Sequence, residues 1–421
     1  SVDWYFKNFY PNYFSIERFS EASGHYYALA KIMRVHIMQI IASMQGPLPY
    51  TKVESGQYSV GYDNEEAAWK AMIDDLNYSI DVLTSLMNTD PSFNELTTED
   101  RIYQGDYKKW IKFANSLKLR IAIRISNAVP EYAQEIAEKA VAHPYGVMDS
   151  NDCDAYDNIG STNFKNGLAS VNSWGEVRAN ACIVSFMNGY GDPRREAYFT
   201  KTTVSPDYEY LGVRSGISGI TTGMFSTYST VKVETKTPML IFNAAEVAFL
   251  RAEGALKGWT MGGTAEEFYK KGIQLSFNEH SISGADTYIA NSVNVPADYI
   301  CPLNSAYNYT NPCKLPVAWN PATTTSAKEE NLERILTQKM IANFPIGNET
   351  WADFRRTGYP AVFPAYDNLS TQGVTKERQQ RRLRFSEDEY ASNGDNVTEA
   401  CSFLSNGQDT DATDLWWAKK N

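Results

Sequence analysis

The sequence has few of the residues and motifs that build most enzyme and metal sites. Its 421 residues include only four histidines, which show no HExxH motif or other zinc-ligand spacing: His25, His36, His143 and His280. It contains neither a GxSxG nucleophile elbow nor a GxxxxGK[ST] phosphate loop. The sequence therefore does not indicate a zinc enzyme, a serine hydrolase or a P-loop protein, and it predicts no catalytic residue, no metal and no cofactor.

Cysteine is also scarce. The five cysteines include no CxxC pair, so a zinc knuckle is not predicted: Cys153, Cys182, Cys301, Cys313 and Cys401. Two of them, Cys301 and Cys313, bracket the loop PLNSAYNYTNP. They could close this loop as a disulfide or remain free thiols, and the sequence leaves both possibilities open.

Long apolar runs and an excess of positive charge are absent as well. No apolar stretch reaches the roughly 20 residues that a membrane-spanning helix needs. The 39 Lys and Arg against 50 Asp and Glu give a formal net charge of −11, which argues against nucleic acid or an anionic membrane surface as the main partner. The basic run KERQQRRLRF at 376–385 leads directly into the acidic SEDE, so it predicts a solvated face or an ion-pair network.

Alanine, by contrast, is abundant in one helical pattern. The segment 243–259, NAAEVAFLRAEGALKGW, repeats apolar residues with the period of an α-helix: Ala245, Ala248, Phe249, Ala252, Ala255 and Leu256. A Gly-containing turn and a second amphipathic segment, 266–281, follow it. Small side chains let two helices approach closely, as in a tetratricopeptide unit. The alanine face is therefore predicted to be a stacking surface. On the same segment, Glu253 and Lys257 predict a solvated ion pair at i, i+4.

Four such helix pairs are predicted along the chain: 24–43 with 64–86, 106–126 with 129–143, 243–259 with 266–281, and 328–344 with 348–358. Unequal insertions separate them, so a regular solenoid is not expected. We predict a mostly α-helical fold in which four tetratricopeptide-like pairs form one scaffold. The corresponding single domain covers 1–421, with pairs at about 24–86, 106–143, 243–281 and 328–358.

Three insertions differ in composition from the helix pairs. Residues 46–63, 150–240 and 282–327 are rich in Gly, Ser, Thr, Asn, Pro and Tyr. The alternating pieces REAYFTKT (195–202) and STVKVET (229–235) predict a few short strands. Loops of this length in a compact protein are usually functional.

Six motifs occur in an order that resembles a known family: GPLPY, GDYKKWIKFANSLKLRIAIRIS, YGDPRREAYF, PMLIFNAAEVAFLRAEGALKGW, ETWADFRRTGYP and RRLRFSEDEYASNGDNVTEA. The chain resembles the SusD/RagB family of surface glycan-binding lipoproteins of Bacteroidetes, from about Gly24 to the closing LWWAKK. Each motif is weak by itself, but the series spans nearly the whole chain.

The resemblance implies a cell-surface, outer-membrane lipoprotein. Such a protein would capture oligosaccharide or another nutrient and pass it to a SusC-like TonB-dependent transporter. Its membrane contact would be a lipid anchor. The sequence departs from the family pattern because it has no lipoprotein signal or acylated cysteine, and because the segment before HYYALAK is short. We therefore expect a processed or truncated chain.

The aromatic residues of the insertions are the predicted ligand contacts. A flat ring covers the apolar C–H face of a sugar while polar groups bond its hydroxyls. The candidates are Tyr58, Tyr62, Trp174, Tyr307, Tyr309 and Trp319, with Trp319 first because LPVAWNP lies outside any helix pair. In the family, ligand contacts come from the first and third insertions, so this assignment is regional. Structural packing is the alternative for each residue.

The sequence leaves two other functions and one metal site open. A protein–protein adaptor would use the helix pairs alone, although the long aromatic insertions count against it. A glycoside hydrolase would need two carboxylates facing a cleft. The loop NDCDAYDN places Asp152, Asp154 and Asp157 close together, either as calcium ligands or as a solvated acidic loop without the EF-hand pattern.

Overall fold

The computed structural model describes residues 2–157, 165–221 and 223–418. Helices dominate this part of the chain, and its sheet has two strands, so the predicted mostly α-helical class is confirmed. The chain divides into two compact units. The first contains residues up to 148, 355–357 and those from 370 onward, and the second contains 149–354 and 358–369.

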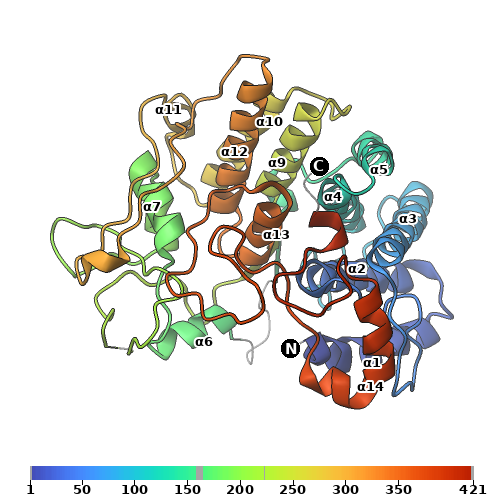
Figure 1. Cartoon of the computed structure of the whole chain (residues 1–421). Coiled ribbons are helices and arrows are strands. Elements are labelled where there is room, and N and C mark those ends of the chain that lie inside the picture. The colour runs from blue at the N-terminus through green and yellow to red at the C-terminus, as the bar shows by residue number, and fades with distance from the viewer. Residues whose placement is uncertain (1, 158–164, 222, 419–421) are drawn as a thin grey trace. The chain divides into compact units, whose positions relative to one another are not determined.

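The first unit is built mainly from helices that pack against their neighbours in the sequence. Its helices are α1 (Val2–Phe19), α2 (Gly24–Gln45), α3 (Glu65–Thr89), α4 (Tyr107–Ile125), α5 (Pro130–Ala142) and α14 (Glu387–Ser402). Helix α2 packs on α3, α3 on α4 and α4 on α5 (Figure 1). Asn64 and Asp106 begin α3 and α4 by accepting hydrogen bonds from backbone N–H groups of the first turn. The two helix pairs predicted in this region are confirmed.

The basic run of the first unit forms the predicted ion-pair network. Arg381 Nε lies 2.6 Å from a carboxylate oxygen of Asp414, and the buried Arg382 pairs with Asp409. The acidic partners come from the loop 409–414 and not from the adjacent SEDE segment. The run therefore ties this loop to the unit.

The second unit contains the third predicted helix pair and most of the two helices predicted as the fourth. Its main helices are α9 (Ala244–Leu256), α10 (Ala265–Glu279) and α12 (Thr325–Ala342), and it also contains α13 (Gly347–Thr357) as far as Phe354. Helices α9, α10 and α12 pack against one another (Figure 1). Thr264 and Glu267 form a capping box that fixes the start of α10, in which the Thr264 backbone N–H donates to the Glu267 carboxylate at 2.7 Å. Helices therefore form at the predicted positions, and α12 packs on α9 and α10.

The alanine-rich helix is a stacking element, as its composition predicts. Ala245 and Ala252 are fully buried because α9 packs against both α10 and α12. Gly272 of α10 faces the ring of Phe249, and a Cβ at this glycine would come within 2.7 Å of ring carbons. Small residues therefore allow the close approach of the two helices.

The prediction of a solvated ion pair on α9 is wrong. Glu253 is 1% exposed, and the Lys257 ammonium lies 3.6 Å from its carboxylate. Glu246 is also buried, where it accepts a hydrogen bond from Asn343 Nδ2 at 2.9 Å. The periodicity of one helix does not reveal that two neighbouring helices cover its polar side as well.

The strand prediction is also largely wrong. Residues Arg195–Tyr198 form the short helix α8, and the predicted alternating pieces meet only at one isolated bridge between Phe199 and Val231. The sheet instead pairs β1 (Ala155–Asp157) with β2 (Met239–Phe242) in antiparallel orientation. Strand β2 leads directly into α9, so the sheet adjoins the start of this helix.

Short helices in the insertions hold the loops in place: α6 (Gly167–Ser173), α7 (Ala181–Tyr190) and α11 (Ala285–Ile289). After α7, Arg194 pairs with Asp192 at 2.6 Å in a fully buried position. The same guanidinium donates to Ser276 of α10 at 2.8 Å and to Gln338 of α12 at 3.0 Å. This contact fixes the second insertion to the helix scaffold.

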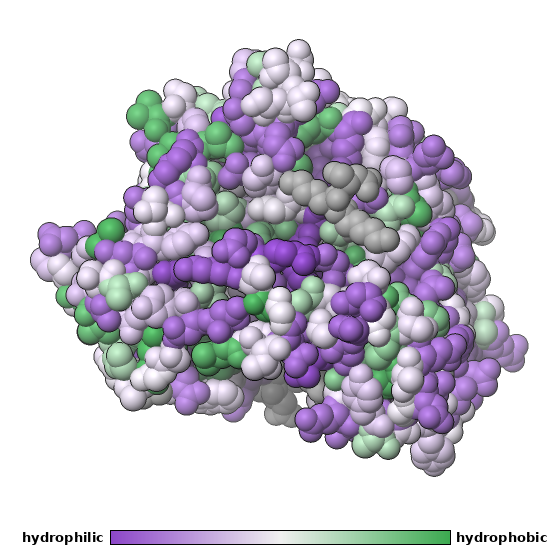
Figure 2. Space-filling view, viewed as in Figure 1, coloured by the Kyte–Doolittle hydropathy of each residue, from purple (hydrophilic) through white to green (hydrophobic). Residues whose placement is uncertain are grey.

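The described surface and the thiols add three findings. No described helix is both long and apolar enough to cross a membrane. On the face in view in Figure 2, hydrophobic residues are scattered among hydrophilic ones and form no broad patch within the described chain. Cys301 and Cys313 are buried, separate thiols, so the free-thiol alternative is the one observed.

Candidate ligand-binding site

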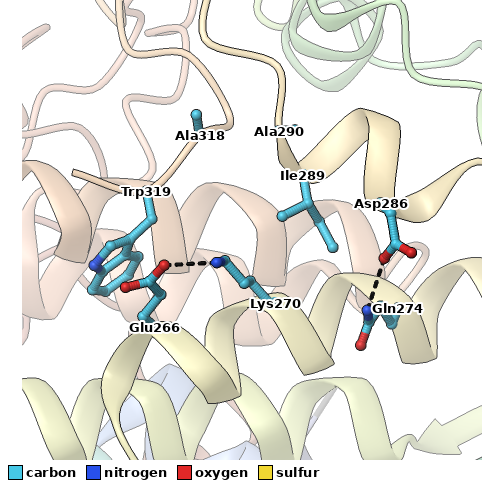
Figure 3. A pocket seen from close by; sticks show the side chains of 8 residues that line it. All are labelled: Glu266, Lys270, Gln274, Asp286, Ile289, Ala290, Ala318 and Trp319. Carbon is cyan, nitrogen blue, oxygen red and sulfur yellow. Dashed lines mark hydrogen bonds and ion pairs between the residues drawn. The ribbon is translucent and has the colours of Figure 1, made fainter. Parts of the chain in front are cut away.

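A hollow of about 380 Å³ lies in the second unit, between α10, α11 and the segment at Trp319. Its lining residues are Glu266, Lys270, Gln274, Asp286, Ile289, Ala290, Ala318 and Trp319. Figure 3 shows Trp319 and Glu266 at one end, Asp286 and Gln274 at the other, and Lys270 and Ile289 between them. The volume falls within the range of small-molecule sites, about 300–1,000 Å³.

Backbone contacts on both sides hold Trp319 in place. The Ala318 N–H donates to the Asn291 carbonyl at 2.9 Å, which connects the segment to the end of α11. The Asn320 N–H donates to Asn331 Oδ1 on α12 at 3.2 Å, and Asn331 Nδ2 donates back to the Asn320 carbonyl at 2.8 Å. The indole is thus positioned before any ligand arrives, which lowers the entropic cost of binding.

The Trp319 ring rests on a buried aromatic support. Its centroid lies 5.3 Å from that of Tyr269, whose hydroxyl donates to the Val317 carbonyl at 2.6 Å. Burial raises the pKa of Tyr269, so this hydroxyl stays protonated as a donor. Trp319 itself is half-buried. The indole therefore has one packed side and a part that lines the hollow.

The polar groups of the hollow are held in pairs. Lys270 Nζ lies 2.6 Å from Glu266 Oε1, and Gln274 Nε2 donates to Asp286 Oδ1 at 2.9 Å (Figure 3). All four side chains lie at the surface, where ligand hydroxyls can reach their remaining donors and acceptors. A ring with neighbouring amide, carboxylate and ammonium groups can bind a molecule that has an apolar face and a hydroxylated rim.

Tyr307 and Tyr309 lie together in a different cluster of this unit, around the buried Arg214. The guanidinium is 4.6 Å from the Tyr309 ring centroid and 5.4 Å from that of Tyr366. The Tyr307 ring meets Tyr366 edge-on at 4.9 Å, and burial lowers the pKa of Arg214. Both predicted tyrosines are half-buried, so these rings contribute to packing as well as to the surface.

The other predicted residues occupy contrasting positions. Tyr58 is 99% exposed, whereas Tyr62 is 2% exposed and donates its hydroxyl proton to Glu389 at 2.7 Å. Both belong to the first unit. Trp174 follows α6 in the second unit and is 66% exposed. Of the six candidates, Trp319 is the one that lines the hollow.

The acidic loop 151–157 connects to the start of α9 through hydrogen bonds. Asp154 accepts a hydrogen bond from the Ala244 N–H at 2.7 Å and another from Asn151 Nδ2 at 2.9 Å, so it caps the start of α9. Asp152 accepts from the Ser150 hydroxyl. Within the described residues, no cluster of three or more His, Cys, Asp or Glu side chains could hold a metal ion.

Sequence reasoning missed the polar side of the hollow. Glu266, Lys270 and Gln274 recur every four residues and therefore share one face of α10. That spacing is visible in the sequence, yet it equally describes any solvated helix face. Only the position of α11 and Trp319 next to this helix face shows that the face lines a hollow.

Comparisons with known proteins agree with the fold. A family model described as SusD-like, "Susd and RagB outer membrane lipoprotein", matches residues 2–418. A SusD-like protein from Bacteroides thetaiotaomicron VPI-5482 has 47% sequence identity and a TM-score of 0.93, over 98% of this chain and 85% of that chain. A chitin-binding SusD homologue from Flavobacterium johnsoniae has 37% identity and a TM-score of 0.94, over 100% of this chain and 86% of that one.

A SusD homologue from Bacteroides uniformis ATCC 8492 is similar as well, with 40% identity and a TM-score of 0.91, over 98% of this chain and 85% of that chain. No curated protein matches the sequence. The family model matches nearly the whole chain. The three similar structures have sequence identities of 37% or more over at least 98% of this chain. This chain therefore belongs to the SusD/RagB family of outer-membrane lipoproteins.

Proposed function

We propose that this protein is a cell-surface glycan-binding lipoprotein that captures oligosaccharide and passes it, uncleaved, to a SusC-like TonB-dependent transporter. The observation that carries the proposal is Trp319, a preorganised, half-buried indole that lines a polar hollow. Membership of the SusD/RagB family supports the cellular role.

The hollow suits a sugar because its two kinds of surface match those of a pyranose. The indole of Trp319 offers a flat apolar platform for the C–H face, worth about 0.5–1.5 kcal/mol by analogy with aromatic pairs. Gln274 and Asp286 offer an amide and a carboxylate for hydroxyl groups. Such modest contributions favour capture that is weak enough for the cargo to be released again.

One relative supports a carbohydrate as the cargo. The Flavobacterium johnsoniae homologue is described as chitin-binding, and it matches the whole of this chain at 37% identity. Its chitin-binding motivates N-acetylchito-oligosaccharide as the first ligand to test. The chemistry of the hollow accepts other hydroxyl-rich glycans equally well.

The arrangement of acids supports binding without hydrolysis. The carboxylates of the hollow are Glu266 and Asp286, which lie at its opposite ends, each held by its own partner (Figure 3). A glycoside hydrolase needs a proton donor and a base or nucleophile on either side of one glycosidic bond. The two carboxylates therefore do not flank a sugar stacked on Trp319 from either side (Figure 3).

The outer-membrane location and the transfer of cargo rest on the family. Its members are described as outer-membrane lipoproteins, and the resemblance read from the sequence links them to SusC-like barrels. The lipid anchor would hold the glycan-binding chain at the surface, next to the transporter that receives its cargo.

A calorimetric panel tests the proposal. The purified protein would be titrated with N-acetylchitohexaose, maltohexaose, cellohexaose and xylohexaose, and the sugars recovered afterwards would be analysed by chromatography. We expect at least one of them to bind and to be recovered intact. Absence of binding to every glycan of a broader array, or release of shorter sugars, would contradict the proposed function.

A further inference from the structure

A second hollow adjoins the Trp319 hollow along the same helix. It has a volume of about 520 Å³ and is lined by α10 and by residues 282–287. Gln274 and Asp286 line both hollows, so the hydrogen-bonded pair that closes one end of the Trp319 hollow also borders the second. The two hollows are therefore neighbours that share a polar boundary.

A polar stripe on α10 runs beneath both hollows. Glu266 and Lys270 line the first hollow, Gln274 lines both, and Asn278 lines the second. These residues follow one another at intervals of four, so they lie along one face of the helix. With a rise of 1.5 Å per residue, the stripe is about 18 Å long. That length is several times the width of one sugar ring.

The lining of the two hollows carries more negative than positive charge. Its acids are Glu266 and Asp286, and its single cation, Lys270, is already paired with Glu266 at 2.6 Å. The second hollow contributes Asn278, Ser283 and Thr287, which are uncharged hydrogen-bonding groups. A carboxylated or sulfated sugar placed here would meet Asp286 without a free cation to compensate for it.

We propose that the two hollows form one extended site for an oligosaccharide longer than a disaccharide, built from uncharged or amino sugars and not from acidic ones. This inference rests on the proposed function and specifies the length and charge of its ligand. Trp319 stacks on one sugar, the Gln274–Asp286 pair bonds the next part of the chain, and Asn278 with Thr287 bonds the part beyond.

Chain length is tested by comparing disaccharides with hexasaccharides of the N-acetylchitose and maltose series in calorimetry. We expect the hexasaccharide that binds to do so about tenfold more tightly than its disaccharide. In the double variant Asn278→Ala, Thr287→Ala, the ratio of hexasaccharide to disaccharide affinity should fall from about ten toward one. Both positions are exposed, and an unchanged circular-dichroism melting curve would confirm that the variant folds.

Charge is tested with hexagalacturonate and with the glucosamine hexamer of chitosan at low and moderate salt. We expect no binding of the galacturonate to the wild type, and measurable binding to Asp286→Lys, which places a free cation in the shared boundary. Tighter binding of galacturonate than of any uncharged hexasaccharide to the wild type would overturn the charge assignment.

The outcomes separate this inference from the function on which it rests. Glycan binding that requires Trp319 but is independent of chain length and of Asn278 and Thr287 would overturn the extended site and leave the proposed function standing. Failure of every glycan to bind, in wild type and variants alike, would overturn the proposed function itself.

Discussion

Trp319 and Tyr62 show why single aromatic residues are hard to interpret from sequence. Both lie in insertions rich in polar residues, yet Tyr62 is buried against Phe385 with its hydroxyl bonded to Glu389, whereas Trp319 lines a hollow. The side chains that decide the difference are more than 300 positions away for Tyr62 and about 50 positions away for Trp319. Composition identifies the aromatic loops, but only long-range packing determines which rings reach the surface.

Glu279 is the residue from which a pH dependence follows. Burial, followed by repulsion from Asp154, raises its pKa from 4.5 to about 8. It accepts hydrogen bonds from the Tyr156 hydroxyl and, at 3.0 Å, from Asn243 Nδ2. Because the folded-state pKa lies above the unfolded value, folding favours the protonated acid. Its contribution to stability is therefore fully present below the unfolded pKa and is lost as the pH rises through about 8.

The variant Glu279→Gln tests this linkage, since glutamine resembles the protonated acid and does not titrate. We expect the wild type to lose stability between about pH 5 and pH 8, and the variant to lose clearly less over the same interval. Urea unfolding at several pH values measures the difference, with the exposed Glu131→Gln as a matched control. Parallel pH profiles for wild type and Glu279→Gln would show that this acid does not titrate abnormally.

At the level of elements, helix pairs follow from sequence far better than strands and buried acids do. The capping residues Asn64, Asp106 and Thr264 and the helical period place the pairs within a few residues. The segment REAYFTKT alternates like a strand, but its first half forms α8. Just before this helix, Arg194 pairs with Asp192 and donates a hydrogen bond to Ser276 of α10. Tertiary contacts of this kind override the local strand propensity, and they cannot be predicted from the segment itself.

The contact between α9 and its neighbours can be tested by enlarging one residue. Ala252 is fully buried on α9, whereas Ala255 on the same helix is only half-buried. We expect Ala252→Leu to overpack the helix contact and to cost about 1–3 kcal/mol of unfolding free energy. Ala255→Leu should cost much less, because its added methyl groups can extend toward solvent. Equal melting temperatures for the two variants would argue against tight stacking of α9.

At the level of the whole molecule, family and fold class follow from sequence because they depend on motifs that extend along the whole chain. The match to the SusD/RagB family covers residues 2–418, and the six motifs lie within the same range. The identity of the ligand cannot be predicted from the sequence in the same way. It depends on a hollow formed by α10, α11 and Trp319, which are brought together only by folding.

The proposed partnership with a SusC-like transporter predicts a stable complex in the native membrane. The full-length lipoprotein, isolated with a mild detergent from its own cells, should bring down a SusC-like barrel in near-equal amounts. A lipid-anchored control protein isolated under the same conditions should not. Repeated isolation of the protein alone, at detergent concentrations that preserve other membrane complexes, would count against the transfer role.

The proposed role, glycan binding without catalysis, predicts that the protein does not cleave polysaccharides in the presence or absence of a chelator. The described residues form no cluster suited to a metal ion, and the acids of the hollow are held apart (Figure 3). Incubation with chitin, starch and xylan should release no reducing sugar, with or without EDTA. Cleavage that EDTA abolishes would reveal a metal-dependent hydrolase instead.

The most direct test of the central claim, that Trp319 is the platform for a captured glycan, is calorimetry of Trp319→Ala with the hexasaccharide that the wild type binds. Trp174→Ala serves as the control, since Trp174 is an exposed tryptophan outside the hollow. We expect Trp319→Ala to bind at least about tenfold more weakly with a nearly unchanged melting temperature, and Trp174→Ala to bind like the wild type. An unfolded Trp319→Ala whose folded fraction binds normally, or a loss of binding in Trp174→Ala alone, would contradict the claim.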